Sequence, residues 1–227
     1  MIFFDILPVV MLGALLGLDV VTFPQAMISR PLVAATAAGA FVGFPLAGLT
    51  IGATLELLAL GMLPFGASKY PEWGSASVVG GVLYASQTGD SPGALPASVL
   101  AALLTAMVSG WSMIRLRRLN AARSAHERAA LDAGSSDAIV GLQLFGLTGD
   151  LIRGGLVTLV AMLVFKPLVP AIVSVWHSNM MYSRALVIAL AAAVAGGAVW
   201  KIFHGISHAR KLFLVGFVVG ITVIVIR

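Results

Sequence analysis

Glu56 is the residue of this sequence whose chemistry most needs an explanation. It lies within Gly52–Gly61, a stretch with apolar residues on both sides of the carboxylate. A charged side chain in such a setting costs about 2.5–3.5 kcal/mol on membrane-insertion scales. We therefore expect Glu56 to be ion-paired, protonated or part of a polar pathway, and Arg30 is a candidate partner.

A second polar interruption runs from Asp19 to Arg30, where Pro24 and Pro31 bracket the residues around Gln25. Prolines at this spacing favour a turn over a continuous helix. The sequence predicts a re-entrant turn or an interface loop here.

Other kinds of chemistry find no support. The chain has no cysteine, which excludes disulfides, Cys-based metal sites and thiol catalysis. Neither metal-ligand spacing nor a Ser/His/Asp set is visible, and no phosphate-binding loop follows a strand. The four histidines fall in predicted loops, where an interfacial or structural role is expected. We predict no catalytic residue, no metal site and no cofactor, so a membrane-embedded enzyme is the least favoured class.

The elements that position these residues must lie in a membrane. Of 227 residues, 59% are hydrophobic and 10% are charged, whereas soluble domains carry about 25% charged residues. Long unbroken apolar runs predict helices, since a barrel would alternate apolar and polar residues. The net charge is +5, and the basic residues lie in clusters between the apolar runs. This pattern is typical of loops at the membrane surface and argues against a nucleic-acid-binding protein. We expect one all-α integral membrane domain over residues 1–227, a polytopic helix bundle with re-entrant or broken helices.

The apolar runs differ in their ability to span a bilayer, which takes about 20 residues. The eight runs are 2–21, 32–64, 75–86, 94–114, 138–149, 154–176, 185–200 and 212–226. Runs 94–114 and 154–176 are long enough, and 2–21 and 185–200 are close to that length. Runs 75–86 and 138–149 are too short for an upright span, so re-entrant or half-membrane pieces are expected there.

The run 32–64 is too long for one helix and is interrupted at Gly43-Phe44-Pro45. One interpretation is a spanning helix, a break and a second element that reaches back into the membrane, as in transporters whose broken helices bind ligands. The other is a plain helix–turn–helix with Glu56 at its end.

Two basic clusters set the orientation. One holds five arginines within 115–128, and the other holds Lys201, Arg210 and Lys211. Both should be cytoplasmic, which puts the loop 177–184 outside, provided that 138–149 does not cross. We expect 115–137 to be a cytoplasmic basic loop with an interfacial helix. Its charges are either a solvated surface or a docking surface for a soluble partner.

Four short motifs occur in an order typical of a known family: Ser29–Ala34 with its Arg-Pro-Leu element, the Gly-rich Gly48–Gly52, Thr54–Gly61 and the pair Gly66-Ala67. Residues 15–90 thereby resemble the IIC subunit of the mannose/fructose/sorbose-type phosphotransferase system (PTS). After residue 90 the similarity rests on hydropathy and the basic loop.

The resemblance implies a subunit of the inner membrane that pairs with a second membrane subunit, IID, and binds a hexose or amino sugar. A soluble IIB protein, charged by IIA, would phosphorylate the sugar, and one part of the protein would move like an elevator against a scaffold. The substrate-binding candidates are Glu56, Thr54, Gln25 and Arg30, because sugars need well-placed donors and acceptors with few charges. A trimeric assembly is typical of the family, and the small-residue spacing Gly13/Gly17 fits close helix packing.

The sequence departs from the family pattern before Arg30. Family members carry a more polar stretch there, whereas this chain has Met27 and Ser29. This difference motivates an alternative hypothesis, a IIC-like structural or binding subunit that no longer transports sugar.

Overall fold

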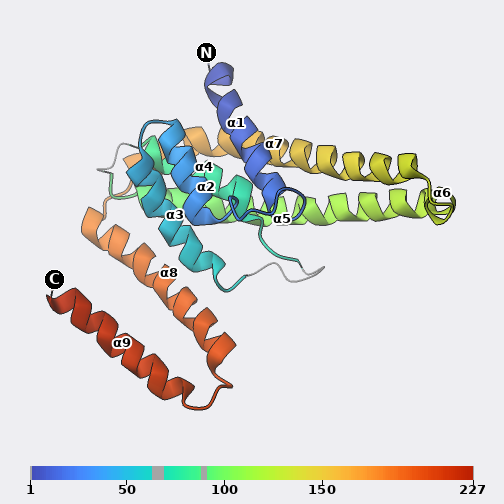
Figure 1. The fold of residues 1–227 in the computed structure, drawn as a ribbon. Helices are drawn as coiled ribbons and strands as arrows, with labels where there is room; N and C mark the ends of the chain where they lie inside the picture. The colour runs from blue at the N-terminus through green and yellow to red at the C-terminus, as the bar shows by residue number, and fades with distance from the viewer. Residues whose placement is uncertain (1, 63–68, 88–90, 227) are drawn as a thin grey trace.

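The computed structural model describes residues 2–62, 69–87 and 91–226, and every regular element in these ranges is a helix. In chain order the helices are α1 (Ile2–Asp19), α2 (Pro31–Phe41), α3 (Pro45–Ala59), α4 (Trp73–Ala85), α5 (Ala94–His126), α6 (Arg128–Asp132), α7 (Ser136–Ser174), α8 (Met180–Phe203) and α9 (Ala209–Ile226). The predicted all-α class is confirmed. Figure 1 shows α5 and α7 side by side as a long hairpin that projects past the other helices, with α6 at its tip.

Four helices of the described chain, α5, α7, α8 and α9, are long and apolar enough to cross a membrane. At 1.5 Å per residue α5 is about 50 Å long and α7 about 58 Å, against about 30 Å for the hydrocarbon core of a bilayer. A large part of the α5–α7 hairpin must therefore project beyond the membrane.

The predicted break in the run 32–64 is confirmed. The α2 and α3 helices are antiparallel and are joined by a turn in which Gly43 has a φ of +89°. The expectation of a spanning helix before the break is wrong, because the 11 residues of α2 cover only about 16 Å. The two helices approach closely at their glycines: a Cβ on Gly48 would lie 2.3 Å from the Ala35 carbonyl oxygen.

The expectation that 138–149 forms a separate re-entrant or interfacial piece is also wrong. These residues are the first part of α7, which continues without a break to Ser174. They pack along α5: a Cβ on Gly149 would lie 2.9 Å from Leu116, and Arg123 stacks over the Phe145 ring at 4.9 Å. The tertiary contact with α5 holds this short apolar run in one long helix.

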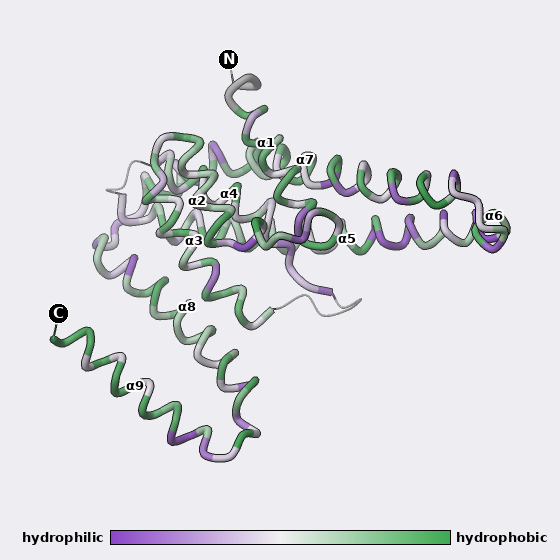
Figure 2. The backbone as a smooth tube through the Cα atoms, in the orientation of Figure 1, coloured by the Kyte–Doolittle hydropathy of each residue, from purple (hydrophilic) through white to green (hydrophobic). Residues whose placement is uncertain are grey.

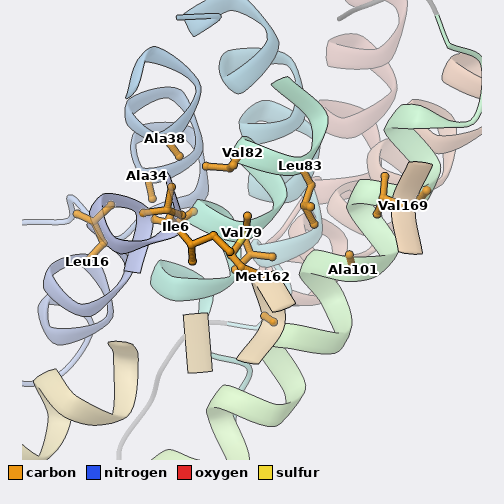
Figure 3. Close-up of a cluster of buried hydrophobic side chains, with 14 residues drawn as sticks. Ile6, Leu16, Ala34, Ala38, Val79, Val82, Leu83, Ala101, Met162 and Val169 are labelled. Atoms are coloured by element: carbon orange, nitrogen blue, oxygen red, sulfur yellow. The ribbon is translucent and has the colours of Figure 1, made fainter. Parts of the chain in front are cut away.

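The helix α4 forms the centre of the bundle. It has only 13 residues, yet every one of them is buried. Figure 3 shows side chains from α1, α2, α4, α5 and α7 meeting around it, with Ile6, Val79 and Met162 at the contact. A half-membrane helix is tolerated where protein covers it, and α4 is covered in this way. That 75–86 is re-entrant in the membrane stays a prediction.

The last two helices lie apart from this bundle. The helix α8 touches α3 and α5, and Figure 1 shows α9 beyond α8, on the side away from the bundle. Ala209 is the only buried residue of α9. Figure 2 shows α9 as hydrophobic along most of its length, while hydrophilic positions gather on the outer half of α5 and around α6. An all-round apolar helix of this kind belongs in lipid.

The pair Gly66-Ala67 of the sequence motif lies outside the described residues, and the sides of the membrane assigned to 115–137 and 177–184 stay predictions. Residues 115–126 continue α5, and α6 follows them after Glu127.

We predict that Gly48→Ala lowers stability, because the new methyl group must displace the backbone of Ala35. Overpacking of this kind costs about 1–3 kcal/mol. The matched control is Gly197→Ala in α8, where a Cβ would meet nothing within 4 Å. There we expect equal or higher stability, since alanine is the better helix former. The apparent melting temperatures of the detergent-solubilised proteins check both; a Gly48→Ala protein as stable as wild type would contradict the close packing.

Candidate functional site

The Glu56 carboxylate is ion-paired, which is one of the three states expected from the sequence. The Arg30 guanidinium donates to Glu56 Oε1, and the backbone N–H of Leu32 donates to Oε2 at 3.2 Å. Leu32 lies in the first turn of α2, where backbone N–H groups have no partner within the helix. Glu56 on α3 therefore caps α2 and balances Arg30, the residue that precedes it.

Thr54 lies apart from this pair. It is buried, and its hydroxyl donates to the Thr50 carbonyl oxygen at 3.0 Å within α3. This bond satisfies the hydroxyl locally.

A cavity of about 490 Å³ opens beside the Arg30 side chain, at the end of the bundle from which the α5–α7 hairpin projects. The lining residues come from the end of α1 and the loop after it, the start of α2, the end of α3 and the residues before α4: Asp19, Val20, Val21, Gln25, Met27, Ser29, Arg30, Pro31, Ala59, Met62, Tyr70, Pro71 and Trp73. We call it the loop cavity. Of the four predicted substrate-binding residues, Gln25 and Arg30 line it, Glu56 reaches it through Arg30, and Thr54 does not line it.

Asp19 organises the loop that forms one wall of the cavity. Its carboxylate accepts hydrogen bonds from the backbone N–H of Ala26 at 2.7 Å and from the N–H and hydroxyl of Ser29 at 2.9 and 2.7 Å. The residues around Ala26 have left-handed backbone, with φ of +58° at Gln25 and +60° at Met27. Non-glycine residues adopt this conformation only where the surroundings enforce it, and the Asp19 bonds supply that constraint.

Polar and aromatic residues line the loop cavity together. The Gln25 amide donates to the Val21 carbonyl oxygen at 2.5 Å and keeps capacity for further bonds. The Tyr70 and Trp73 side chains are buried, and the Trp73 indole N–H finds no acceptor within the described part of the chain. Buried indole N–H groups usually have a partner, so the Trp73 N–H is an unsatisfied donor, among the described residues, in a residue that lines the cavity.

An ionic network lies directly behind the cavity wall. Arg153 on α7 donates to Asp150 Oδ1 at 2.6 Å and to the Ser109 hydroxyl on α5 at 2.8 Å, and its Nη1 lies 3.9 Å from Glu72 Oε2. Ser109 donates in turn to Glu72 at 2.6 Å. All three charged side chains are buried, with relative exposures of 7% for Arg153, 3% for Asp150 and 0% for Glu72.

This network holds the cavity wall in place at two points. Thr22, in the loop after α1, donates to Asp150 Oδ2. Glu72 accepts from the Ser75 N–H at 3.2 Å and so caps α4 at the residue before Trp73. The side chains of α7 thereby fix both the loop and the start of α4.

Glu72, Asp150 and Arg153 were not among the residues predicted from the sequence. A signal was present, because Asp150 and Arg153 lie three residues apart between two apolar runs, at a spacing that faces one side of a helix. Within the described residues no group of three or more His, Asp or Glu side chains is placed to hold a metal ion.

We predict that Arg153→Met strongly destabilises the protein, because it leaves two buried carboxylates without their cation. Removing one partner of a buried ion pair costs about 3–5 kcal/mol. The control is Arg128→Met, whose pair with Asp132 on α6 is exposed and is expected to contribute almost nothing. Thermal unfolding of both variants in detergent checks this; equal losses of stability would show that the network does not hold the bundle together.

Comparison with known proteins gives the family. The family model described as "PTS system sorbose-specific iic component" matches residues 3–225. The sorbose-specific EIIC components of Lacticaseibacillus casei and Klebsiella pneumoniae are each 41% identical to this chain over 54 residues, which is 24% of this chain. The matched segment spans 20% of the length of each of these relatives.

Two solved structures share the fold. One, titled a structure of a membrane protein, has a TM-score of 0.72, and the mannose transporter ManYZ in complex with microcin E492 has a TM-score of 0.63. Both are 21% identical to this chain, and each match covers 96% of this chain and 86% of the other. The fold is thus that of a multi-pass membrane protein. Because the family model covers nearly all of its length, the chain belongs to the sorbose-specific IIC component family of the phosphotransferase system.

Proposed function

We propose that this chain is the sugar-binding IIC subunit of a mannose-type PTS transporter and that the loop cavity holds the sugar. The observation that carries the proposal is the cavity's lining, which combines three polar residues, Asp19, Gln25 and Arg30, with two aromatic residues, Tyr70 and Trp73. Its volume of about 490 Å³ lies within the range of small-molecule sites, about 300–1,000 Å³.

The chemistry of this lining suits a hexose or an amino sugar. A sugar presents hydroxyl groups that both donate and accept, and an amide, a carboxylate and a guanidinium supply the complementary groups. Tyr70 and Trp73 offer apolar ring faces with a polar tip. The Asp19 carboxylate holds the loop wall through its bonds to Ala26 and Ser29 and lines the cavity itself.

The location of the cavity agrees with phosphorylation by a partner. It lies at the hairpin end of the bundle, which the positive-inside rule places at the cytoplasm. All four histidines are exposed and none lies in the described cavity lining. The phosphoryl group would accordingly come from a soluble IIB protein charged by IIA, and this chain would position the sugar without catalytic chemistry of its own.

The α2–α3 turn supports a second membrane subunit, IID. Phe41, Phe44 and Leu46 around this turn are exposed. Irregular backbone at membrane depth is tolerated where protein or a water-filled cavity covers it. A IID subunit would supply that cover.

The alternative function, a subunit that keeps the fold without transport, is favoured by Met27. This side chain lines the cavity and is 73% exposed. Ser29, by contrast, is committed to Asp19. Sugar binding decides between the two functions.

We predict that Gln25→Ala weakens sugar binding about tenfold, the equivalent of about 1.4 kcal/mol for a lost hydrogen bond. The measurement is calorimetric titration of the purified protein, with and without IID, against L-sorbose, D-mannose, D-fructose and D-glucosamine. Gln143→Ala is the control, since Gln143 is an exposed amide on the hairpin. No binding by wild type in the presence of IID would favour the alternative function.

We predict that Glu56→Gln abolishes uptake while the protein still assembles, because Arg30 loses its balancing charge beside the cavity. Uptake of radiolabelled sugar by cells carrying the complete transporter measures this, with membrane yield as the control for assembly. Glu127→Gln removes the same charge at the hairpin tip and should transport normally. Normal uptake by an assembled Glu56→Gln protein would remove Glu56 from the site.

A further inference from the structure

Tyr70 connects the loop cavity to the projecting hairpin. Its side chain lines the cavity and is 7% exposed. Its hydroxyl accepts a hydrogen bond from the Arg117 guanidinium, whose central carbon lies 5.1 Å from the centre of the tyrosine ring. Arg117 therefore contacts both the polar tip and the ring of one cavity residue.

Helix α5 holds this segment along its backbone as well. The Glu72 N–H donates to the Ala106 carbonyl oxygen at 3.0 Å, and a Cβ on Gly110 would lie 2.3 Å from the Tyr70 carbonyl oxygen. Glycine at 110 thus lets the chain lie directly on α5, and Arg117, two turns further along, secures the side chain.

Arg117 differs from the other arginines of the basic cluster. It is half-buried, whereas Arg115 and Arg118 beside it are exposed. The structure shows no carboxylate within ion-pair distance of Arg117 in the described part of the chain. Its charge is met by the phenol oxygen and by the electron-rich face of the ring, an arrangement that gains strength when water is excluded.

We infer that Arg117 is a positioning residue of the loop cavity, which holds Tyr70 in the wall and couples the cavity to the part of α5 that projects from the membrane. The inference rests on the proposed function in one respect, the sugar as the ligand of the cavity. Its consequence is that displacement of the outer half of α5, where a soluble partner can reach, moves a residue of the sugar site.

The experiment compares Arg117→Ala, Tyr70→Phe and the double variant with Arg118→Ala as the matched control. Binding of L-sorbose and D-mannose is titrated for each protein with IID present. We expect Arg117→Ala to weaken binding about three- to tenfold, as for one charged hydrogen bond and one cation–π contact, and Arg118→Ala to leave it unchanged. The double variant should bind sugar with about the affinity of whichever single variant binds it less tightly. The reason is that both substitutions remove the same hydrogen bond between Arg117 and the Tyr70 hydroxyl. Arg117→Lys, which keeps a cation and a donor, should recover part of the affinity.

A second readout needs no sugar. The chain has no cysteine, so Ala59→Cys places a single buried thiol in the cavity lining. We expect Arg117→Ala to raise its labelling by a water-soluble maleimide several-fold and Arg118→Ala to leave it unchanged, at similar melting temperatures. If wild type binds no sugar, the proposed function fails while the labelling still tests the link. Equal labelling and equal affinity in the Arg117→Ala and Arg118→Ala proteins would overturn the inference. If Arg117→Ala does not fold, Tyr70→Phe and Arg117→Lys are compared with Arg118→Ala in the same two measurements.

Discussion

The structure depends on one buried cation, the guanidinium of Arg153. An isolated charge in this environment would be too costly to bury, so the fold must bring partners to it from several helices. Asp150 lies one turn earlier on α7, Ser109 comes from α5, Glu72 precedes α4, and the Gly17 carbonyl oxygen near the end of α1 accepts from Nη2 at 3.4 Å. A guanidinium has five N–H donors in a fixed plane. Satisfying them from four elements fixes the register of those elements.

The small residues of the bundle make this convergence possible. In a membrane, helix association gains little from the hydrophobic effect and relies on close packing and interhelical hydrogen bonds. A Cβ on Gly17 would lie 2.6 Å from the Ser75 hydroxyl, and a Cβ on Gly13 would lie 2.1 Å from that of Thr158. The helix α1 can therefore lie against α4 and α7 with its carbonyl oxygens open to their side chains, and Ser75 donates to the Gly13 carbonyl oxygen at 3.2 Å. Close packing and the ionic network are one arrangement, since neither forms at a larger distance.

The sequence predicted features that rest on local chemistry and missed those that rest on tertiary contact. The break at Gly43-Phe44-Pro45 follows from backbone preferences. The cost of an isolated charge left three explanations for Glu56, and the ion pair with Arg30 is the one that the structure shows. The continuity of α7 does not follow from its sequence, because the polar pair Asp150 and Arg153 divides its apolar pattern into two runs. That pair becomes intelligible only when Glu72 and Ser109 are brought beside it by other helices. The cavity is formed by four separate segments, and of its lining only Gln25 and Arg30 were predicted from the sequence as substrate-binding residues.

The distribution of these contacts also determines which helices can move relative to one another. Helices α1, α4, α5 and α7 are joined by buried charged hydrogen bonds, and moving one of them would leave charges without partners. Helix α8 buries only Ser183, Ala191 and Ala195, and a Cβ on Gly61 beyond α3 would meet Ala198 at 3.5 Å, an ordinary contact. A polar contact joins α8 to α4, the hydrogen bond that Arg184 donates to the Tyr84 hydroxyl at 3.2 Å. An elevator-like motion of the kind that the resemblance implies would break fewer buried charged hydrogen bonds at the boundary between α8–α9 and the rest than between α1, α4, α5 and α7. The loop cavity has walls from both this rigid group and the α2–α3 pair, and the Arg30–Glu56 ion pair joins its α2 and α3 walls.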